Sequence, residues 1–139
     1  QEALDTLMKR MEDDRGKFVV IASGYKDNMD AFMSVNPGLS SRFTHRMHID
    51  DYNEDELLSI FKKMASKDEY VLSQAAELKL MDAICRLVVS KDSQFGNARE
   101  MRNLLDKIIQ HLSYRVSKMQ PSEITEDVFK VIMPEDIYN

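Results

Sequence analysis

Apolar positions along residues 1–15 recur with the period of an α-helix. Four apolar residues fall at the i, i+3, i+4 and i+7 spacing, which places them on one helical face. These residues are Leu4, Leu7, Met8 and Met11. Gly16 is expected to end the helix. Because no capping residue precedes Gln1, the helix is expected to begin earlier in a longer chain.

The next apolar segments predict part of an α/β layer. Residues 18–22 form a short β-branched run, which is typical of a strand covered on both faces. Residues 26–35 predict a short helix that the sequence NPG breaks. Residues 43–49 alternate apolar and polar positions, which predicts a second strand. Helix, strand, helix and strand in succession indicate an α/β remnant of a parallel sheet, whose other strands are expected outside this chain.

From Asn53 onward, the pattern predicts helices only. Asn53 and Glu56 have the spacing of a capping box. Ser73, Asn97 and Thr125 are expected to cap three further helices. Four helices with short connections can close over a small core. Their apolar stripes include Leu57, Phe61, Leu80, Ile84, Met101, Leu105, Ile108, Val128 and Ile132.

Composition narrows the classes of partner and compartment. The 139 residues are 43% hydrophobic and 31% charged, which is typical of a globular protein. The net charge of −5 disfavours a general nucleic-acid or anionic-membrane surface. No apolar run approaches the roughly 20 residues that span a bilayer, and the first residues have no apolar core of a signal peptide. The single Cys85 predicts a reduced setting, and we expect a bacterial cytoplasmic protein.

Metal and nucleophile chemistry is disfavoured by spacing. His45 and His48 lie three apart on a predicted strand, so their side chains should point to opposite faces. His111 is expected to be a partly buried helical residue. The acidic run at residues 12–14 is interpreted as the solvated end of the first helix. No serine, histidine and acid form a recognisable nucleophile motif, and no metal site is expected.

Two arginines stand out as candidates for binding an anion. Residues 36–43, NPGLSSRF, predict a turn that presents Arg42 at the start of a strand. Residues 95–103, FGNAREMRN, place Arg99 in the first turn of a helix. Arginine there opposes the helix dipole by about 0.3–1 kcal/mol, which indicates an external anion. Arg102, one turn later, is interpreted as a solvent-facing residue and is the weaker candidate.

These segments resemble the second half of an AAA+ ATPase module in their order and spacing. They read RMEDDRGKFVVIASGY, NPGLSSRF, HIDDYNEDEL and FGNARE. The resemblance extends over residues 1–116 and is strongest to the group of red-type rubisco activases, sporulation stage V protein K and type VII secretion ATPases. It implies that residues 1–52 are the end of the nucleotide-binding αβα core. Residues 53–139 would then be the helical AAA+ lid.

The resemblance assigns a role to each arginine. Arg42 matches the arginine finger, which reaches the γ-phosphate held by a neighbouring subunit and stabilises the transition state. Arg99 matches sensor 2, which touches the nucleotide of its own subunit. Gly96 and Asn97 precede it and are expected to bind nucleotide as well, with Arg102 as a weaker candidate.

The end of the VVIASGY segment corresponds to sensor 1. Many AAA+ proteins carry a small polar residue there, whereas this chain has Gly24 and Tyr25. Ser23 and Tyr25 are the candidates for that role.

The motifs that hold ATP and Mg²⁺ do not occur in this sequence. In the family they precede the segment that begins at Gln1, as do the pore loops. We therefore expect ATP and Mg²⁺ to bind the full-length protein, and this chain alone neither to bind ATP tightly nor to hydrolyse it.

The expected function is that of a chaperone-like ring, a hexamer of identical copies, that couples hydrolysis to remodelling a protein. That protein could be rubisco, a secreted protein or a sporulation factor. Two alternatives stay open: a non-catalytic AAA-like interaction module and a DNA-related AAA+ ATPase.

Overall fold

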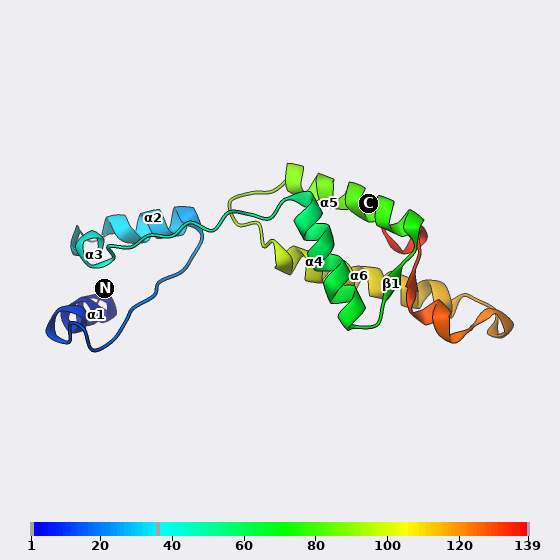
Figure 1. The fold of residues 1–139 in the computed structure, drawn as a ribbon, viewed down its shortest axis with the longest axis horizontal. Helices are drawn as coiled ribbons and strands as arrows, with labels where there is room; N and C mark the ends of the chain where they lie inside the picture. The colour runs from blue at the N-terminus through cyan, green and yellow to red at the C-terminus, as the bar shows by residue number, and fades with distance from the viewer. Residues whose placement is uncertain (1, 36, 139) are drawn as a thin grey trace. The chain divides into compact units, whose positions relative to one another are not determined.

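The computed structural model describes residues 2–35 and 37–138. The chain divides into two compact units, Gln1–Ile49 and Asp50–Asn139 (Figure 1). Among the described residues, no helix combines the length and the apolar character needed to cross a bilayer.

The first unit consists of three helices around a very small interior. They are α1 (Glu2–Asp13), α2 (Lys26–Val35) and α3 (Pro37–Arg42). α3 contacts both α1 and α2 and contributes the fully buried Leu39. Phe32 and Phe43 pack edge to face, with their ring centroids 6.2 Å apart. The helices predicted at residues 1–15 and 26–35 are thus confirmed.

The structure corrects the expected surroundings of Arg42. Residues 37–42 form a short helix rather than a turn that leads into a strand, and Arg42 is the last residue of that helix. Pro37 suits the first helical position because its fixed φ is already helical and its missing N–H would have had no partner there. Burial of Leu39 then anchors the helix against its neighbours.

The segments expected to be strands in the first unit are irregular. Neither residues 18–22 nor residues 43–49 pair with another segment among the described residues. Val19, Ile21 and Met47 are between 85% and 91% exposed. A strand requires a hydrogen-bonded neighbour, so an apolar run without one stays extended and uncovered. Sequence patterning identified the apolar run but could not supply its partner.

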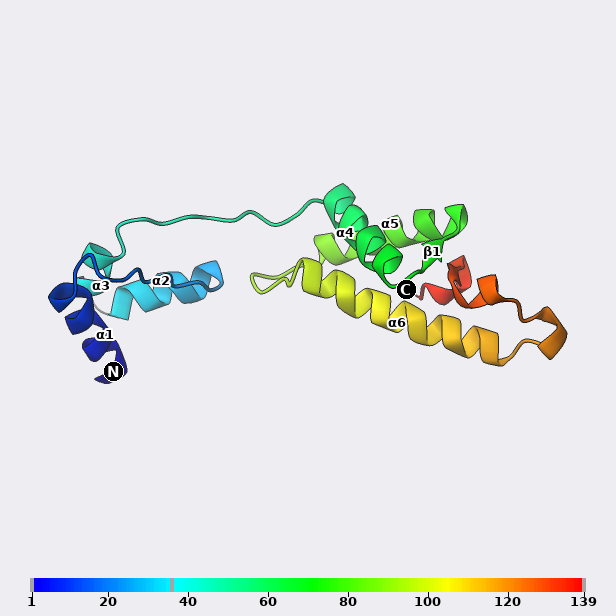
Figure 2. The same ribbon diagram turned by 60° about the horizontal axis from the view of Figure 1, so that its bottom comes forward.

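The second unit contains the main hydrophobic core. Its long helices are α4 (Glu54–Lys67), α5 (Gln74–Val89) and α6 (Ala98–Ser117), as predicted. α4 packs against both α5 and α6 (Figure 2). The buried face of each helix follows the predicted stripe. The core contains Leu57, Phe61, Ala65, Ala76, Leu80, Ala83, Ile84, Met101, Leu105, Ile108, Leu112, Val116, Ile132 and Ile137.

Two of the predicted helix caps are confirmed. The Asn53 side chain accepts a hydrogen bond from the Glu56 backbone N–H at 2.9 Å, and Asn53 N–H donates to the Glu56 carboxylate at 2.9 Å. Ser73 accepts from the Ala76 N–H at 3.2 Å. Both caps satisfy backbone donors that the first helical turn cannot pair internally.

Replacing Asn53 with alanine is expected to lower the free energy of unfolding by about 1 kcal/mol, because the first turn of α4 loses its cap. A urea titration of the 139-residue chain measures this loss. Asn103 lies exposed within α6, so the same substitution there is a matched control that should be neutral or slightly stabilising, since alanine is the better helix former. Equal losses from Asn53→Ala and Asn103→Ala would contradict the capping role.

The predicted fourth helix is the main departure in this unit. Residues 121–138 form three short 3₁₀ helices, η1 (Pro121–Glu123), η2 (Glu126–Phe129) and η3 (Pro134–Asp136). Thr125 precedes η2 but makes no side-chain cap bond. Between η2 and η3, β2 (Val131–Ile132) pairs in parallel with β1 (Val71–Leu72). Val131 and Ile132 are β-branched and therefore favour a strand over a helix. With β1 available as a partner, they form a strand.

A buried ion pair holds this terminal segment to α6. Arg115 donates two hydrogen bonds to the Asp136 carboxylate, at 2.7 and 2.9 Å, and a third to the Val131 carbonyl at 3.1 Å. Asp136 is only 1% exposed and also accepts from the Met133 N–H at 2.9 Å. The carboxylate raises the pKa of Arg115 above its ordinary value. The guanidinium therefore remains charged, and its positive charge neutralises the negative charge of the buried Asp136 carboxylate.

Candidate functional site

Arg99 lies in the first turn of α6. It is the second residue of α6 and is exposed. Within the described part of the chain, its guanidinium makes no hydrogen bond or ion pair. The preceding turn is tight: a Cβ added at Gly96 would lie 3.2 Å from the Arg99 Cβ and 2.9 Å from a carboxylate oxygen of Glu100. The turn thus presents a positive side chain at the positive end of a helix dipole.

Asn97 marks the beginning of α6 but does not cap it as predicted. Its side chain makes no cap hydrogen bond, and its φ is +49°. Its Oδ1 accepts from the Tyr52 N–H at 3.0 Å, and its Nδ2 donates to the Asp51 carboxylate at 2.8 Å. The amide therefore binds the segment that leads into α4 instead of its own helix. A positive φ at a non-glycine residue costs about 1–3 kcal/mol, which the surrounding contacts must offset.

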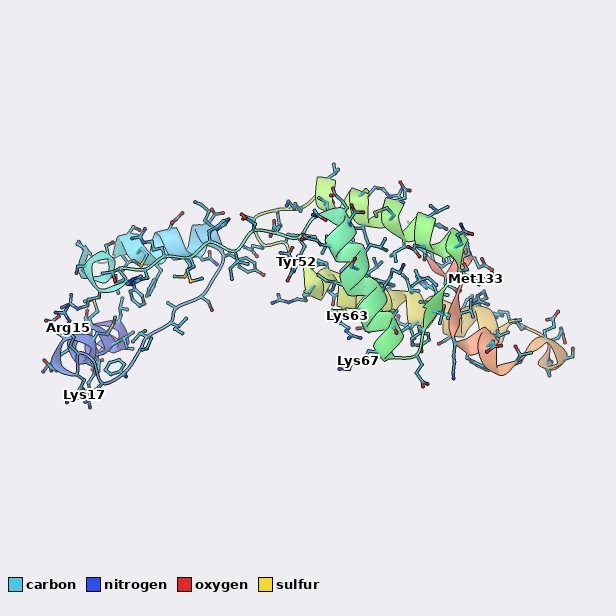
Figure 3. The ribbon with its side chains drawn as sticks, in the orientation of Figure 1. Arg15, Lys17, Tyr52, Lys63, Lys67 and Met133 are labelled. Carbon is cyan, nitrogen blue, oxygen red and sulfur yellow. The ribbon has the colours of Figure 1, made fainter. Side chains whose placement is uncertain are left out.

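Asp51 is held from a second direction by the loop between α5 and α6. Lys91 donates to the other carboxylate oxygen of Asp51 at 2.8 Å, and its ammonium lies 6.0 Å from the centre of the Phe95 ring. Tyr52, at the entry to α4, is labelled in Figure 3. The sequence analysis did not identify these residues as a cluster. The acidic pair in HIDDYNEDEL was the available signal, but nothing local identifies its partners.

Arg42 is partly buried and already engaged within the first unit. Its Nη2 donates to the Glu12 carboxylate at 3.1 Å, and its Nη1 donates to the Gly38 carbonyl at 3.2 Å. Its Nε is buried without a partner among the described residues. Because the Glu12 side chain is 61% exposed, the ion pair is expected to contribute only about 0–1 kcal/mol. The guanidinium is thus held in place by weak contacts, and its buried Nε–H is unused among the described residues.

The remaining candidates lie in ordinary surroundings. Ser23 is exposed, and Tyr25 is partly buried with its carbonyl accepting from the Met29 N–H at 2.9 Å at the start of α2. Arg102 pairs with Asp68, with a nitrogen to oxygen distance of 2.9 Å, across α6 and the end of α4. This pair is internal to the second unit.

Acidic and histidine side chains serve local contacts. In the acidic run, Asp14 pairs with Arg10 and Lys17 at 3.0 and 2.9 Å, and the hydrogen bonds from Lys17 and then Arg10 lower the pKa of Asp14. His111 is partly buried, and its Nδ1 lies 3.0 Å from the Asp136 carbonyl. Over residues 2–35 and 37–138, no group of three or more possible ligands could hold a metal ion.

Residues 53–139, which comprise α4 to η3 and the C-terminal residues, match the AAA lid domain family. The match covers more than half of the chain. The chain therefore belongs to the AAA lid domain family, as its resemblance predicted.

Three curated relatives are similar over most of this chain. It is 38% identical over 136 residues to the protein CfxQ homolog of Guillardia theta, covering 98% of this chain and 46% of the relative. It is 41% identical over 117 residues to the stage V sporulation protein K of Bacillus subtilis, covering 84% and 36%. The chloroplastic ribulose bisphosphate carboxylase/oxygenase activase of Cyanidioschyzon merolae is 35% identical over 136 residues, covering 98% and 46%. The chain thus spans about half the length, or less, of these relatives.

Proposed function

We propose that this chain forms the C-terminal part of the ATPase module of an AAA+ protein, which hydrolyses ATP in a ring and remodels a protein partner. Residues 1–52 would complete the nucleotide-binding core, and residues 53–139 form the lid. Membership of the AAA lid domain family and the similarity to an activase and a sporulation protein support this proposal. We place the protein in the cytoplasm, as a ring of six identical subunits.

The observation that carries the proposal is the exposed Arg99 at the N-terminus of α6, whose guanidinium has no partner among the residues that the structure describes. A guanidinium presents planar donors that match the oxygens of a phosphate. The neighbouring helix N-terminus favours the same negative charge. We assign Arg99 as the lid residue that contacts the nucleotide of its own subunit. Gly96 and Asn97 form the turn that presents it.

Arg42 would act on the nucleotide of the neighbouring subunit. A phosphate can replace the Glu12 carboxylate as the partner of Arg42, since an exposed ion pair contributes little free energy. A charge placed against the transferring phosphoryl group stabilises the transition state. Hydrolysis would therefore depend on assembly, because Arg42 acts only across a subunit boundary.

ATP and Mg²⁺ are the cofactors that this function requires. Arg99 would contact the phosphates of the ATP in its own subunit, and Arg42 those of the ATP in the neighbouring subunit. We assign no Mg²⁺ ligand here, because residues 2–35 and 37–138 contain no suitable group of ligands. Mg²⁺ supplies charge neutralisation between the phosphates when it is bound.

Replacing Arg99 with alanine in the full-length protein is expected to weaken ATP binding by about ten- to a hundred-fold, since it removes a charged hydrogen bond to phosphate. Calorimetry with ATP measures the change. Arg86→Ala is the matched control, because Arg86 is also a helical arginine of the second unit but pairs with Asp82 at 3.0 Å. Equal ATP affinity in the Arg99→Ala variant and the unmodified protein would refute the proposed contact.

A further inference from the structure

The chain enters α4 through a pair of residues that are tied to the start of α6. Asp51 and Tyr52 directly precede the Asn53 cap, and both are hydrogen-bonded to the Asn97 side chain. Asn97 lies two residues before Arg99. The contacts join positions that are 45 and 46 residues apart in sequence.

Both the backbone and the side chain of Asn97 depart from the geometry of an ordinary N-cap residue. Asparagine is among the preferred N-cap residues, yet here its side chain makes no bond to the first turn of α6. Its φ of +49° favours glycine over other residues. Both polar atoms of the amide are used on the entry segment instead. Backbone conformations of this kind are typical of functional positions.

A second contact holds Asp51 through its other carboxylate oxygen. Lys91 binds the remaining oxygen of Asp51 at 2.8 Å, so this carboxylate contacts both ends of the loop between α5 and α6. We name these contacts, among Asp51, Tyr52, Lys91 and Asn97, the entry clamp. All four residues belong to the second unit.

We propose that Asn97 is a positioning residue: through the entry clamp it makes residues 51–52 and the Arg99 turn move as one body. Residues 44–50, which directly precede the clamp, are irregular and exposed, so they lie outside this body. Without the clamp, the Arg99 turn would be released from residues 51–52, which would move its guanidinium relative to the nucleotide. This inference rests on the proposed function of Arg99.

The test uses Asn97→Gly in the full-length protein. Glycine tolerates the positive φ and removes both hydrogen bonds to residues 51–52, together with the long bond of 3.4 Å from Nδ2 to the Phe95 carbonyl, so the change tests the clamp without adding backbone strain. We expect kcat/KM for ATP to fall about ten-fold. If Asn97 acts through Arg99, then Asn97→Gly causes no further loss in the Arg99→Ala background, because the two effects are not additive. Additive losses would overturn the inference, as would full activity in the Asn97→Gly variant.

Ser73→Ala serves as the matched control for stability. It removes a confirmed cap from α5 and should destabilise the second unit without changing kcat/KM. A similar loss of activity in Ser73→Ala would show that any loosening of the lid suffices, and would overturn a specific role for Asn97.

A second measurement separates this inference from the proposed function. In NMR spectra of the 139-residue chain, Asp51→Ala is expected to shift the backbone amide resonances of residues 97–100, whereas Ser73→Ala leaves them unchanged. Unchanged amides in Asp51→Ala would refute the clamp. Shifted amides in Asp51→Ala would support the clamp even if the unmodified full-length protein had no ATPase activity. That lack of activity would refute the proposed function alone.

Discussion

Replacing Arg42 with alanine in the assembled full-length protein is expected to lower kcat for ATP hydrolysis by about a thousand-fold, the contribution typical of an arginine supplied in trans. The physical reason is that negative charge on the transferring phosphoryl group loses its guanidinium partner. Phosphate release under saturating ATP measures kcat. ATP binding should change far less, because the residue acts mainly on the transition state.

Two variants control for changes in the first unit. Arg46→Ala removes an exposed arginine four residues further along and should leave kcat unchanged. Glu12→Gln removes the carboxylate that pairs with Arg42 at 3.1 Å and should not lower kcat, since that pair competes with phosphate. If Arg42→Ala retains the kcat of Arg46→Ala, the assignment of Arg42 is wrong.

A mixing experiment tests whether Arg42 acts across a subunit boundary. Full-length subunits that carry Arg42 but have an inactivated ATP-binding motif, which the family places before Gln1, are combined with Arg42→Ala subunits in which that motif is intact. Neither population should hydrolyse ATP alone, and the mixture should regain part of the activity. Mixed rings without any gain would contradict action in trans.

Replacing Asp136 with alanine is expected to lower the free energy of unfolding of the second unit by about 3–5 kcal/mol, because it leaves a partly buried guanidinium without its carboxylate. It also leaves the Met133 N–H without its acceptor. Such a loss is a large share of the stability of a typical domain, roughly 5–15 kcal/mol. Urea denaturation of the 139-residue chain, followed by circular dichroism, measures it.

The same helix provides the matched control. Arg102 pairs with Asp68 at the surface, where both side chains are about 40% exposed, so Arg102→Ala should cost no more than about 1 kcal/mol. The double variant Arg115→Met with Asp136→Leu should recover much of the loss, since it removes both charges. Equal destabilisation by Asp136→Ala and Arg102→Ala would show that burial does not distinguish the two pairs.

The sequence alone was sufficient for the long helices and for two of their caps. The apolar stripes of α4, α5 and α6 have the period of a helix, and Asn53 and Ser73 bond to backbone atoms three residues away. Interactions of this range depend only on neighbouring residues. The position of Arg99 in the first turn of a helix follows from the same local chemistry. Residues 37–42 were predicted as a turn that leads into a strand, but they form a short helix that ends at Arg42.

Tertiary structure decided the features that join distant residues. Asn97 has the sequence signature of a cap, but its amide binds Asp51, which lies 46 residues away. Nothing local pairs Arg115 with Asp136, which lies 21 residues later in the sequence. Val131 and Ile132 become a strand because β1 is there to pair with them. In each case the local pattern permits several partners, and only packing of the complete unit selects one of them, since a polar group must be paired where it is buried.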